Sequence, residues 1–86
     1  MLEFLDASDE RVLAYVRQYG EETLLVVHNL SRSVQPVELD LRQFCGVTPV
    51  ELIGNTEFPR IGERPYCLSL EPHGFYWFRL VGGAGT

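Results

Sequence analysis

Apolar and polar residues alternate along most of the chain with a period of two, which is the spacing of side chains on a β-strand. Residues 12–19 show this most clearly, because one face holds small apolar residues and the other holds larger ones (Val12, Ala14 and Val16 against Leu13, Tyr15 and Tyr19). Residues 23–30 are apolar on both faces, so this segment is predicted to lie in the middle of a sheet. The short polar break at Gly20 predicts a hairpin between the two segments.

Further strand patterns follow at intervals of about ten residues. After a short opening segment at 2–5, strands are expected at 34–41, 50–53, 66–71 and 75–80. The strand at 34–41 has one polar face, where Glu38 and Asp40 protect an edge from aggregation. It also contains Pro36, which has no backbone N–H to donate, so the strand is predicted either to lie at the edge of a sheet or to carry a bulge near its start. The whole pattern predicts an all-β fold: an antiparallel β-sandwich of six to eight strands with Greek-key or hairpin connections.

The connections are rich in turn residues. Residues 41–44 favour a single helical turn before Gly46, and residues 56–65 are expected to form a loop that Phe58 and Ile61 fasten to the core.

The turn at Pro72-His73-Gly74 is expected to use Gly74 for a positive φ. Residues 81–86 are small and glycine-rich, so we expect a flexible tail or the start of a linker there, which leaves residues 1–80 as one domain.

The charge pattern narrows the choice of partners. The formal net charge is −5, and the seven basic residues are arginines that stand singly, so we expect no nucleic-acid partner and no binding to anionic lipid. No apolar run approaches the roughly 20 residues that span a bilayer, and Met1 is not followed by a signal-peptide pattern. We therefore expect a cytoplasmic protein in which Cys45 and Cys67 are free thiols.

The ionisable residues do not form a recognisable catalytic pattern. His28 lies in the most apolar strand and is interpreted as a structural histidine with a satisfied hydrogen bond, while His73 is interpreted as a solvated turn residue. Glu21 and Glu22 are expected at a solvated hairpin tip. We therefore predict no catalytic residue, no cofactor and no metal site in this chain.

The aromatic run Phe75-Tyr76-Trp77-Phe78 is the most unusual feature of the sequence. Alternation places Phe75 and Trp77 on one face and Tyr76 and Phe78 on the other. One pair is expected to fill the core while a neighbouring domain covers the other; the alternative is a platform on which sugar rings stack. The candidate aromatics for a domain interface or a sugar site are Tyr15, Tyr19, Phe75 and Trp77.

Several segments also carry a family resemblance, and they cover most of the chain up to Leu80. They include Val12-Leu13-Ala14-Tyr15, the stretches 25–32 and 35–41, and the closing run 72–80, which is the most specific single piece. These segments resemble the C-terminal β domain of trehalose synthases, which are members of the α-amylase superfamily of glycoside hydrolases. The resemblance implies a parent enzyme whose N-terminal (β/α)₈ barrel interconverts maltose and trehalose. None of the barrel motifs occurs here, so the resemblance assigns no catalytic residue to this chain.

The leading hypothesis is a non-catalytic accessory domain that packs on the N-terminal catalytic barrel of such an enzyme and stabilises it. A first alternative is a carbohydrate-binding module for α-glucans. A second is a module that joins subunits or a downstream kinase domain, and a stand-alone enzyme comes last. Because the packing face would be bare in the isolated domain, self-association is also expected.

Overall fold

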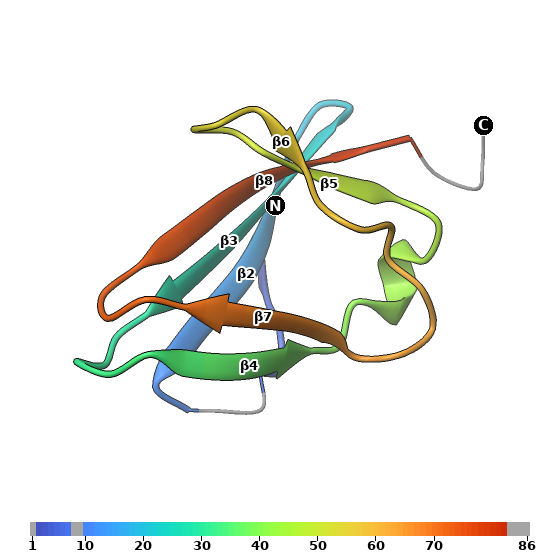
Figure 1. Ribbon diagram of the computed structural model, residues 1–86. Helices are drawn as coiled ribbons and strands as arrows, with labels where there is room; N and C mark the ends of the chain where they lie inside the picture. Colours follow the sequence, from blue (N-terminus) through green and yellow to red (C-terminus); the bar gives the residue numbers. More distant parts are fainter. Residues whose placement is uncertain (1, 8–9, 83–86) are drawn as a thin grey trace.

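Eight strands and one 3₁₀ turn make up the computed structural model, which describes residues 2–7 and 10–82. The elements are β1 (Leu2–Phe4), β2 (Val12–Tyr19), β3 (Glu22–Asn29), β4 (Gln35–Leu39), η1 (Arg42–Phe44), β5 (Thr48–Glu51), β6 (Thr56–Glu57), β7 (Tyr66–Leu70) and β8 (Phe75–Val81). Six strands form one sheet in the order β1-β2-β3-β8-β5-β6, and β4 pairs with β7 in a second sheet. Every pair is antiparallel, so the predicted all-β sandwich is confirmed (Figure 1).

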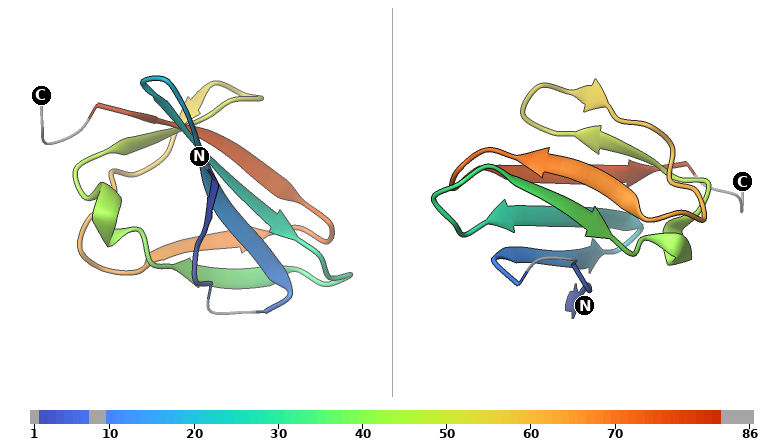
Figure 2. Two further views of the ribbon diagram at one scale, coloured as in Figure 1. Left: turned by 180° about the vertical axis from the view of Figure 1, so that it is seen from behind. Right: turned by 60° about the horizontal axis from the view of Figure 1, so that its bottom comes forward.

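The centre of the large sheet is built from β2, β3 and β8. As predicted from its two apolar faces, β3 lies between two partners: Val26 pairs with Tyr15 on one side and with Trp77 on the other. Hairpins join β2 to β3 and β5 to β6, while the connections β3–β4 and β7–β8 cross between the sheets. These crossings place β4 and β7 over β3 and β8 (Figure 2).

The core lies between the two sheets. Alternate residues of β4 and β7 point inward, among them Val37, Leu39 and Leu68, and meet the buried face of the large sheet. Phe78 is the largest of the fully buried side chains in the described part of the chain. Pro36 lies exposed on β4, whose strand partner among the described residues is β7, so the predicted edge position is confirmed.

The connections between β4 and β7 follow the sequence predictions with two corrections. The turn η1 and the positive φ of Gly46 (94°) occur where they were expected, and Ile61 is buried while Phe58 packs against the core. However, the strand expected at 50–53 is displaced to Thr48–Glu51, because Glu51 ends it by binding the following backbone N–H groups. The expected loop 56–65 therefore begins with the short strand β6, which pairs with β5.

The last strand is longer than expected. Val81 pairs with Thr48, so β8 ends one residue inside the segment that was expected to be a tail. Residues 83–86 of that segment lie outside the described residues.

The turn before β8 also differs from its prediction, because His73 rather than Gly74 has a positive φ (54°). Gly74 is needed for close approach instead: a Cβ at this position would lie 2.9 Å from the carbonyl oxygen of Glu71, which accepts the N–H of Gly74 at 2.7 Å. No helix in the described parts of the chain is long and apolar enough to cross a bilayer.

Candidate functional site

The outer face of the large sheet carries a continuous group of apolar side chains that no other part of the described chain covers. The paired positions Phe4–Tyr15, Tyr15–Val26 and Val26–Trp77 make one row across four strands. A second row pairs Leu13 with His28 and His28 with Phe75. We call these seven residues the outer apolar face: Phe4, Leu13, Tyr15, Val26, His28, Phe75 and Trp77.

The outer apolar face is exposed to an unusual degree for aromatic side chains. Phe4, Phe75 and Trp77 expose 64%, 48% and 50% of their surface. The middle of the face forms a shallow hollow of about 280 Å³, which is lined by all seven residues except Phe4. A contiguous apolar patch of this kind on a small domain is typical of a surface that binds another molecule.

The rings of this face do not lie in one plane. Phe75 and Trp77 are 6.1 Å apart with an interplanar angle of 54°, and Phe4 meets Tyr15 edge-on at 5.8 Å. Edge-to-face and tilted contacts of this kind are the packing that aromatic rings prefer with one another. A flat platform for stacked sugar rings requires coplanar rings, and neither of these two pairs is coplanar.

The structure brings together three of the four aromatics predicted as candidates. Tyr15, Phe75 and Trp77 lie side by side, whereas Tyr19 lies at the end of β2, where the Arg17 guanidinium carbon sits 4.8 Å from the centre of its ring. Tyr76 and Phe78 point to the core and stack at 5.3 Å, so alternation divided the aromatic run correctly.

His28 was interpreted as a structural histidine with a satisfied hydrogen bond, and the structure differs from this in the expected hydrogen bond. Its ring lies half-buried on the outer apolar face, edge-on to Phe75 at 6.0 Å, and makes no hydrogen bond to any residue that the structure describes. His73 is an exposed turn residue, as expected. Cys45 and Cys67 are free and exposed.

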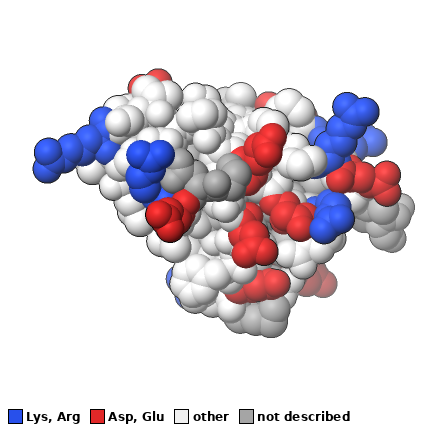
Figure 3. Space-filling view, turned by 90° about the horizontal axis from the view of Figure 1, so that it is seen from below, with Lys and Arg blue, Asp and Glu red and all other residues white. Residues whose placement is uncertain are grey.

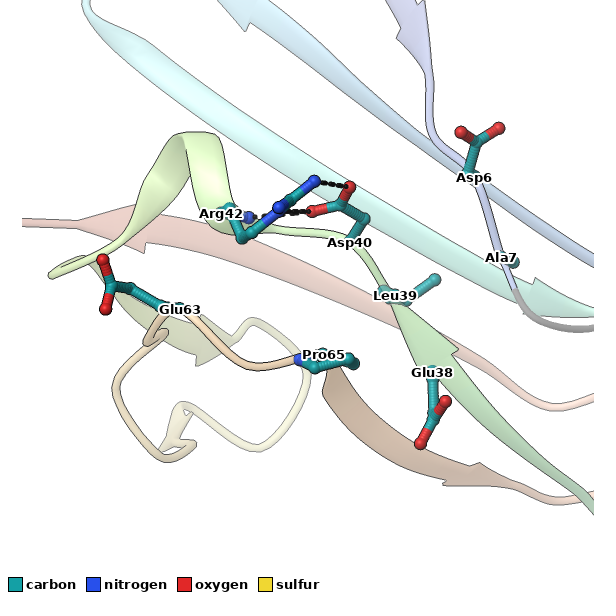
Figure 4. A pocket seen from close by; sticks show the side chains of 8 residues that line it. All are labelled: Asp6, Ala7, Glu38, Leu39, Asp40, Arg42, Glu63 and Pro65. Atoms are coloured by element: carbon teal, nitrogen blue, oxygen red, sulfur yellow. Dashed lines mark hydrogen bonds and ion pairs between the residues drawn. The ribbon is translucent and has the colours of Figure 1, made fainter.

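A second hollow, of about 380 Å³, collects acidic side chains from three parts of the chain. Asp6, Glu38, Asp40 and Glu63 line it, but Figure 4 shows that the carboxylates of Asp6, Glu38 and Glu63 point in different directions. Hydrogen bonds from the Arg42 side chain, at 3.0 Å, and from its backbone N–H hold the pKa of Asp40 below its usual value.

Acidic groups are also spread over the underside of the molecule, with arginines toward its periphery (Figure 3). Among the described residues, no three His, Cys, Asp or Glu side chains form a group that could hold a metal ion. The acidic hollow therefore has neither the convergence of a metal site nor that of a pair of catalytic carboxylates.

The comparisons with known proteins decide the family. Residues 2–77 match the family described as "Maltogenic Amylase, C-terminal domain". The chain belongs to this family. This maltogenic amylase C-terminal domain is 58% identical over 80 residues to a trehalose synthase/amylase of Mycobacterium tuberculosis (strain H37Rv), a match that covers 90% of the chain and 13% of the relative.

Two further relatives are also trehalose synthases. The domain is 56% identical over 83 residues to a trehalose synthase of Pimelobacter sp. (92% of the chain, 14% of the relative). It is 46% identical over 79 residues to one of Thermus thermophilus (92% of the chain, 8% of the relative). The resemblance to the C-terminal domain of trehalose synthases is thus confirmed, and the chain spans only a small part of the length of these relatives.

A solved structure has a similar fold at low identity. It is a GH27 β-L-arabinopyranosidase from Geobacillus stearothermophilus in complex with arabinose, with a TM-score of 0.73 and 14% identity. The match covers 88% of the domain and 18% of that chain. At this identity the likeness shows the fold alone.

Sequence reasoning missed one structurally important residue of the domain, Asn29. Its side chain is fully buried, and its amide nitrogen lies 2.8 Å, 3.3 Å and 2.9 Å from the carbonyl oxygens of Ser33, Leu70 and Glu71. Its Oδ1 accepts the N–H of Ser31 at 2.9 Å. The signal was present in the sequence, because Asn29 is a polar residue at the next inward position after Leu25 and Val27.

Proposed function

We propose that this domain is a non-catalytic accessory domain of a longer enzyme of the trehalose synthase type, and that its outer apolar face packs against the catalytic barrel of that enzyme. The outer apolar face is the observation that carries the proposal. Covering it removes half-exposed rings from water, which stabilises both partners at roughly 25 cal/mol for each Å² of apolar surface that becomes buried.

The path of the chain favours the catalytic barrel as the occupant of this face. In a C-terminal accessory domain the catalytic barrel comes earlier in the sequence. The chain enters the fold through β1, an edge strand of the large sheet, and Phe4 of this strand belongs to the outer apolar face. A barrel that precedes Leu2 is therefore tethered beside the face, and this tether raises its effective concentration there.

In this proposal the parent enzyme interconverts maltose and trehalose, and the barrel supplies every catalytic group. The domain contributes surface coverage and stability. A cytoplasmic location for the parent is part of the proposal, and the free thiols of Cys45 and Cys67 are compatible with a reducing compartment.

A domain-swap experiment tests the docking. The 86-residue chain replaces the matching region of the M. tuberculosis relative. Hydroxyl-radical footprinting compares side-chain oxidation in this chimera and in the isolated chain, which is diluted until light scattering shows a monomer. We expect the oxidation rate of Trp77 and Phe75 to fall several-fold in the chimera, while exposed Cys67 on β7 reacts equally in both proteins. Equal oxidation of Trp77 in both proteins would contradict the proposal.

A carbohydrate-binding module is the second candidate function, favoured by the half-exposed rings of Phe75 and Trp77. The angle of 54° between these rings weighs against it. Because Trp77 is the single tryptophan of the chain, its fluorescence reports directly on this surface. We expect no change when maltooligosaccharides are added to the isolated chain up to millimolar concentration, and a saturable change would favour the binding module.

The same face explains why the isolated domain is expected to self-associate, and it could instead join subunits or a downstream kinase domain. Light scattering after size-exclusion chromatography, over a series of concentrations, tests this. We expect association of the isolated chain that disappears in the chimera, where the barrel covers the face. Association that persists in the chimera would favour the subunit-joining role.

A further inference from the structure

The hairpin turn at residues 51–55, between β5 and β6, is held in one shape by its own side chains. The carboxylate of Glu51 accepts the N–H of Ile53 at 2.8 Å and that of Gly54 at 2.7 Å, one with each oxygen. Asn55 adopts a left-handed conformation (φ 53°), and the hydroxyl of Thr56 donates to the carbonyl oxygen of Gly54 at 3.3 Å. The conformation of this turn is therefore fixed before any partner binds.

This rigid turn presents an isoleucine to solvent. Ile53 exposes 74% of its surface, more than any other exposed large hydrophobic residue that the structure describes. Turns are normally built from Gly, Asn, Asp, Pro and Ser, and an isoleucine at a turn tip adds nothing to the core of the domain. Its β-branched side chain has few rotamers, so little entropy is lost when it is buried.

The turn adjoins the outer apolar face. The N–H of Leu52 donates to the carbonyl oxygen of Trp77 at 2.8 Å, which extends the pairing of β5 with β8 by one residue. Leu52, the residue before Ile53, is thus bonded directly to the strand that carries Phe75 and Trp77, and Ile53 is the next residue of the turn.

We infer that Ile53 is an anchor residue, which inserts into an apolar pocket on the same catalytic barrel that covers the outer apolar face. This inference rests on the proposed function. It adds Ile53 to the docking surface and an apolar pocket to the surface of the barrel. Anchors of this kind work best when they are preorganised, because the turn then loses little conformational freedom on binding. Glu51 is a positioning residue that holds the anchor in place.

The decisive variant is Ile53→Asp, made in the chimera and in the isolated chain. Val34→Asp is the matched control, because Val34 is also an exposed aliphatic residue (51%) but lies in the loop before β4. Ile53→Val is the conservative variant. In the chimera we expect Ile53→Asp to shift the docking equilibrium about tenfold toward the open form, which is the effect of losing one strong interface residue.

Footprinting of Trp77 measures this shift. We expect faster Trp77 oxidation in the Ile53→Asp chimera, and unchanged oxidation in the Val34→Asp and Ile53→Val chimeras. The Glu51→Gln chimera should show a smaller increase, because an amide oxygen can replace only one of the two carboxylate acceptors. In the isolated chain, urea unfolding of Ile53→Asp should match that of the unaltered protein.

The possible failures are distinguishable. If Trp77 is unprotected in the unaltered chimera, the proposed function itself fails. If Trp77 is protected there, and equally protected in the Ile53→Asp chimera, the anchor is wrong and the proposed function stands. Destabilisation of the isolated chain by Ile53→Asp would show a structural role and overturn the inference. The inference would also be overturned if the protection of Trp77 depended on the concentration of the chimera, because a second copy of the chimera would then cover the outer apolar face.

Discussion

The two faces of the large sheet have similar apolar character but different surroundings. On the inner face, Leu25, Val27 and Phe78 are fully buried, because β4 and β7 cross over them. On the outer face, Phe75 and Trp77 of the same strand β8 remain half exposed. An apolar strand face therefore indicates that another structural element covers it, but the pattern does not identify that element. The second sheet covers the inner face, and we propose that a separate domain covers the outer face.

The largest expected effect on stability comes from removing one aromatic ring, first from the inner face and then from the outer face. Phe78→Ala should lower the free energy of unfolding of the isolated chain by about 3–5 kcal/mol, because it leaves a cavity in a core that cannot collapse fully. Trp77→Ala should lower it less, by about 1–2 kcal/mol, because half of this ring's surface is already exposed to water. Urea unfolding followed by circular dichroism measures both, and similar losses for the two variants would remove the distinction between the faces.

The next effect concerns the buried amide at the end of β3. Asn29→Ala should cost about 2–3 kcal/mol, because it leaves buried carbonyl oxygens of β7 and its following turn without their donor. Gln43→Ala removes an exposed amide and serves as the control. The same urea experiment applies, and a loss no larger than that of the control would mean that Asn29 does not help to hold the sheets together.

A smaller loss of stability is expected at the loop between β6 and β7. The hydroxyl of Tyr66 donates to the carbonyl oxygen of Pro59 at 2.6 Å, so Tyr66→Phe should cost about 1 kcal/mol. Burial raises the pKa of Tyr66 above its usual value near 10. The folded protein therefore keeps this proton at a pH where the unfolded chain has lost it, and the contribution to stability falls as pH rises above the unfolded value.

This pH dependence is measurable as unfolding curves between pH 8 and about pH 11, the range in which tyrosine begins to ionise. The unaltered chain should lose stability more steeply than Tyr66→Phe at the alkaline end. Parallel curves for the two proteins would indicate that the hydroxyl is no more buried in the folded state than in the unfolded chain.

The smallest effect is expected away from both faces, at the exposed pair of Asp40 and Arg42. The Arg42 hydrogen bonds lower the pKa of Asp40, so the pair favours the folded state above the ordinary aspartate pKa and ceases to do so as pH falls through the lowered value. Arg42→Gln should raise the Asp40 pKa toward its usual value in an NMR titration and leave thermal stability almost unchanged. A large loss of stability would show that this exposed pair matters more than its solvation allows.

Much of the fold could be predicted because strand patterns are local. The period-two alternation located β2 at its observed bounds and placed β3 and β7 within a residue of theirs. The prediction was less accurate where local hydrogen bonds shape the backbone. Glu51 ends β5 early through two hydrogen bonds, and in the turn before β8 the positive φ lies at His73 while Gly74 lies close to the backbone of Glu71.

The candidate site was predicted in part. Alternation separated Phe75 and Trp77 from Tyr76 and Phe78, but both pairs are aromatic, so nothing in the pattern could decide which pair faces the core. The role of Asn29 depends on Leu70, a partner 41 residues away, and Tyr19 was included although the end of β2 carries it beyond the hollow. Contacts between distant segments have no local signal.

The sequence by itself determined which residues form strands, where most turns occur and which side chains share a face, because these properties depend on neighbours two or three positions away. The tertiary structure decided which face β4 and β7 cover, how the rings of the outer apolar face are tilted and which turn is fastened beside them. These features arise when chain segments far apart in sequence are packed together, and packing depends on shape and burial, which the one-dimensional pattern does not record.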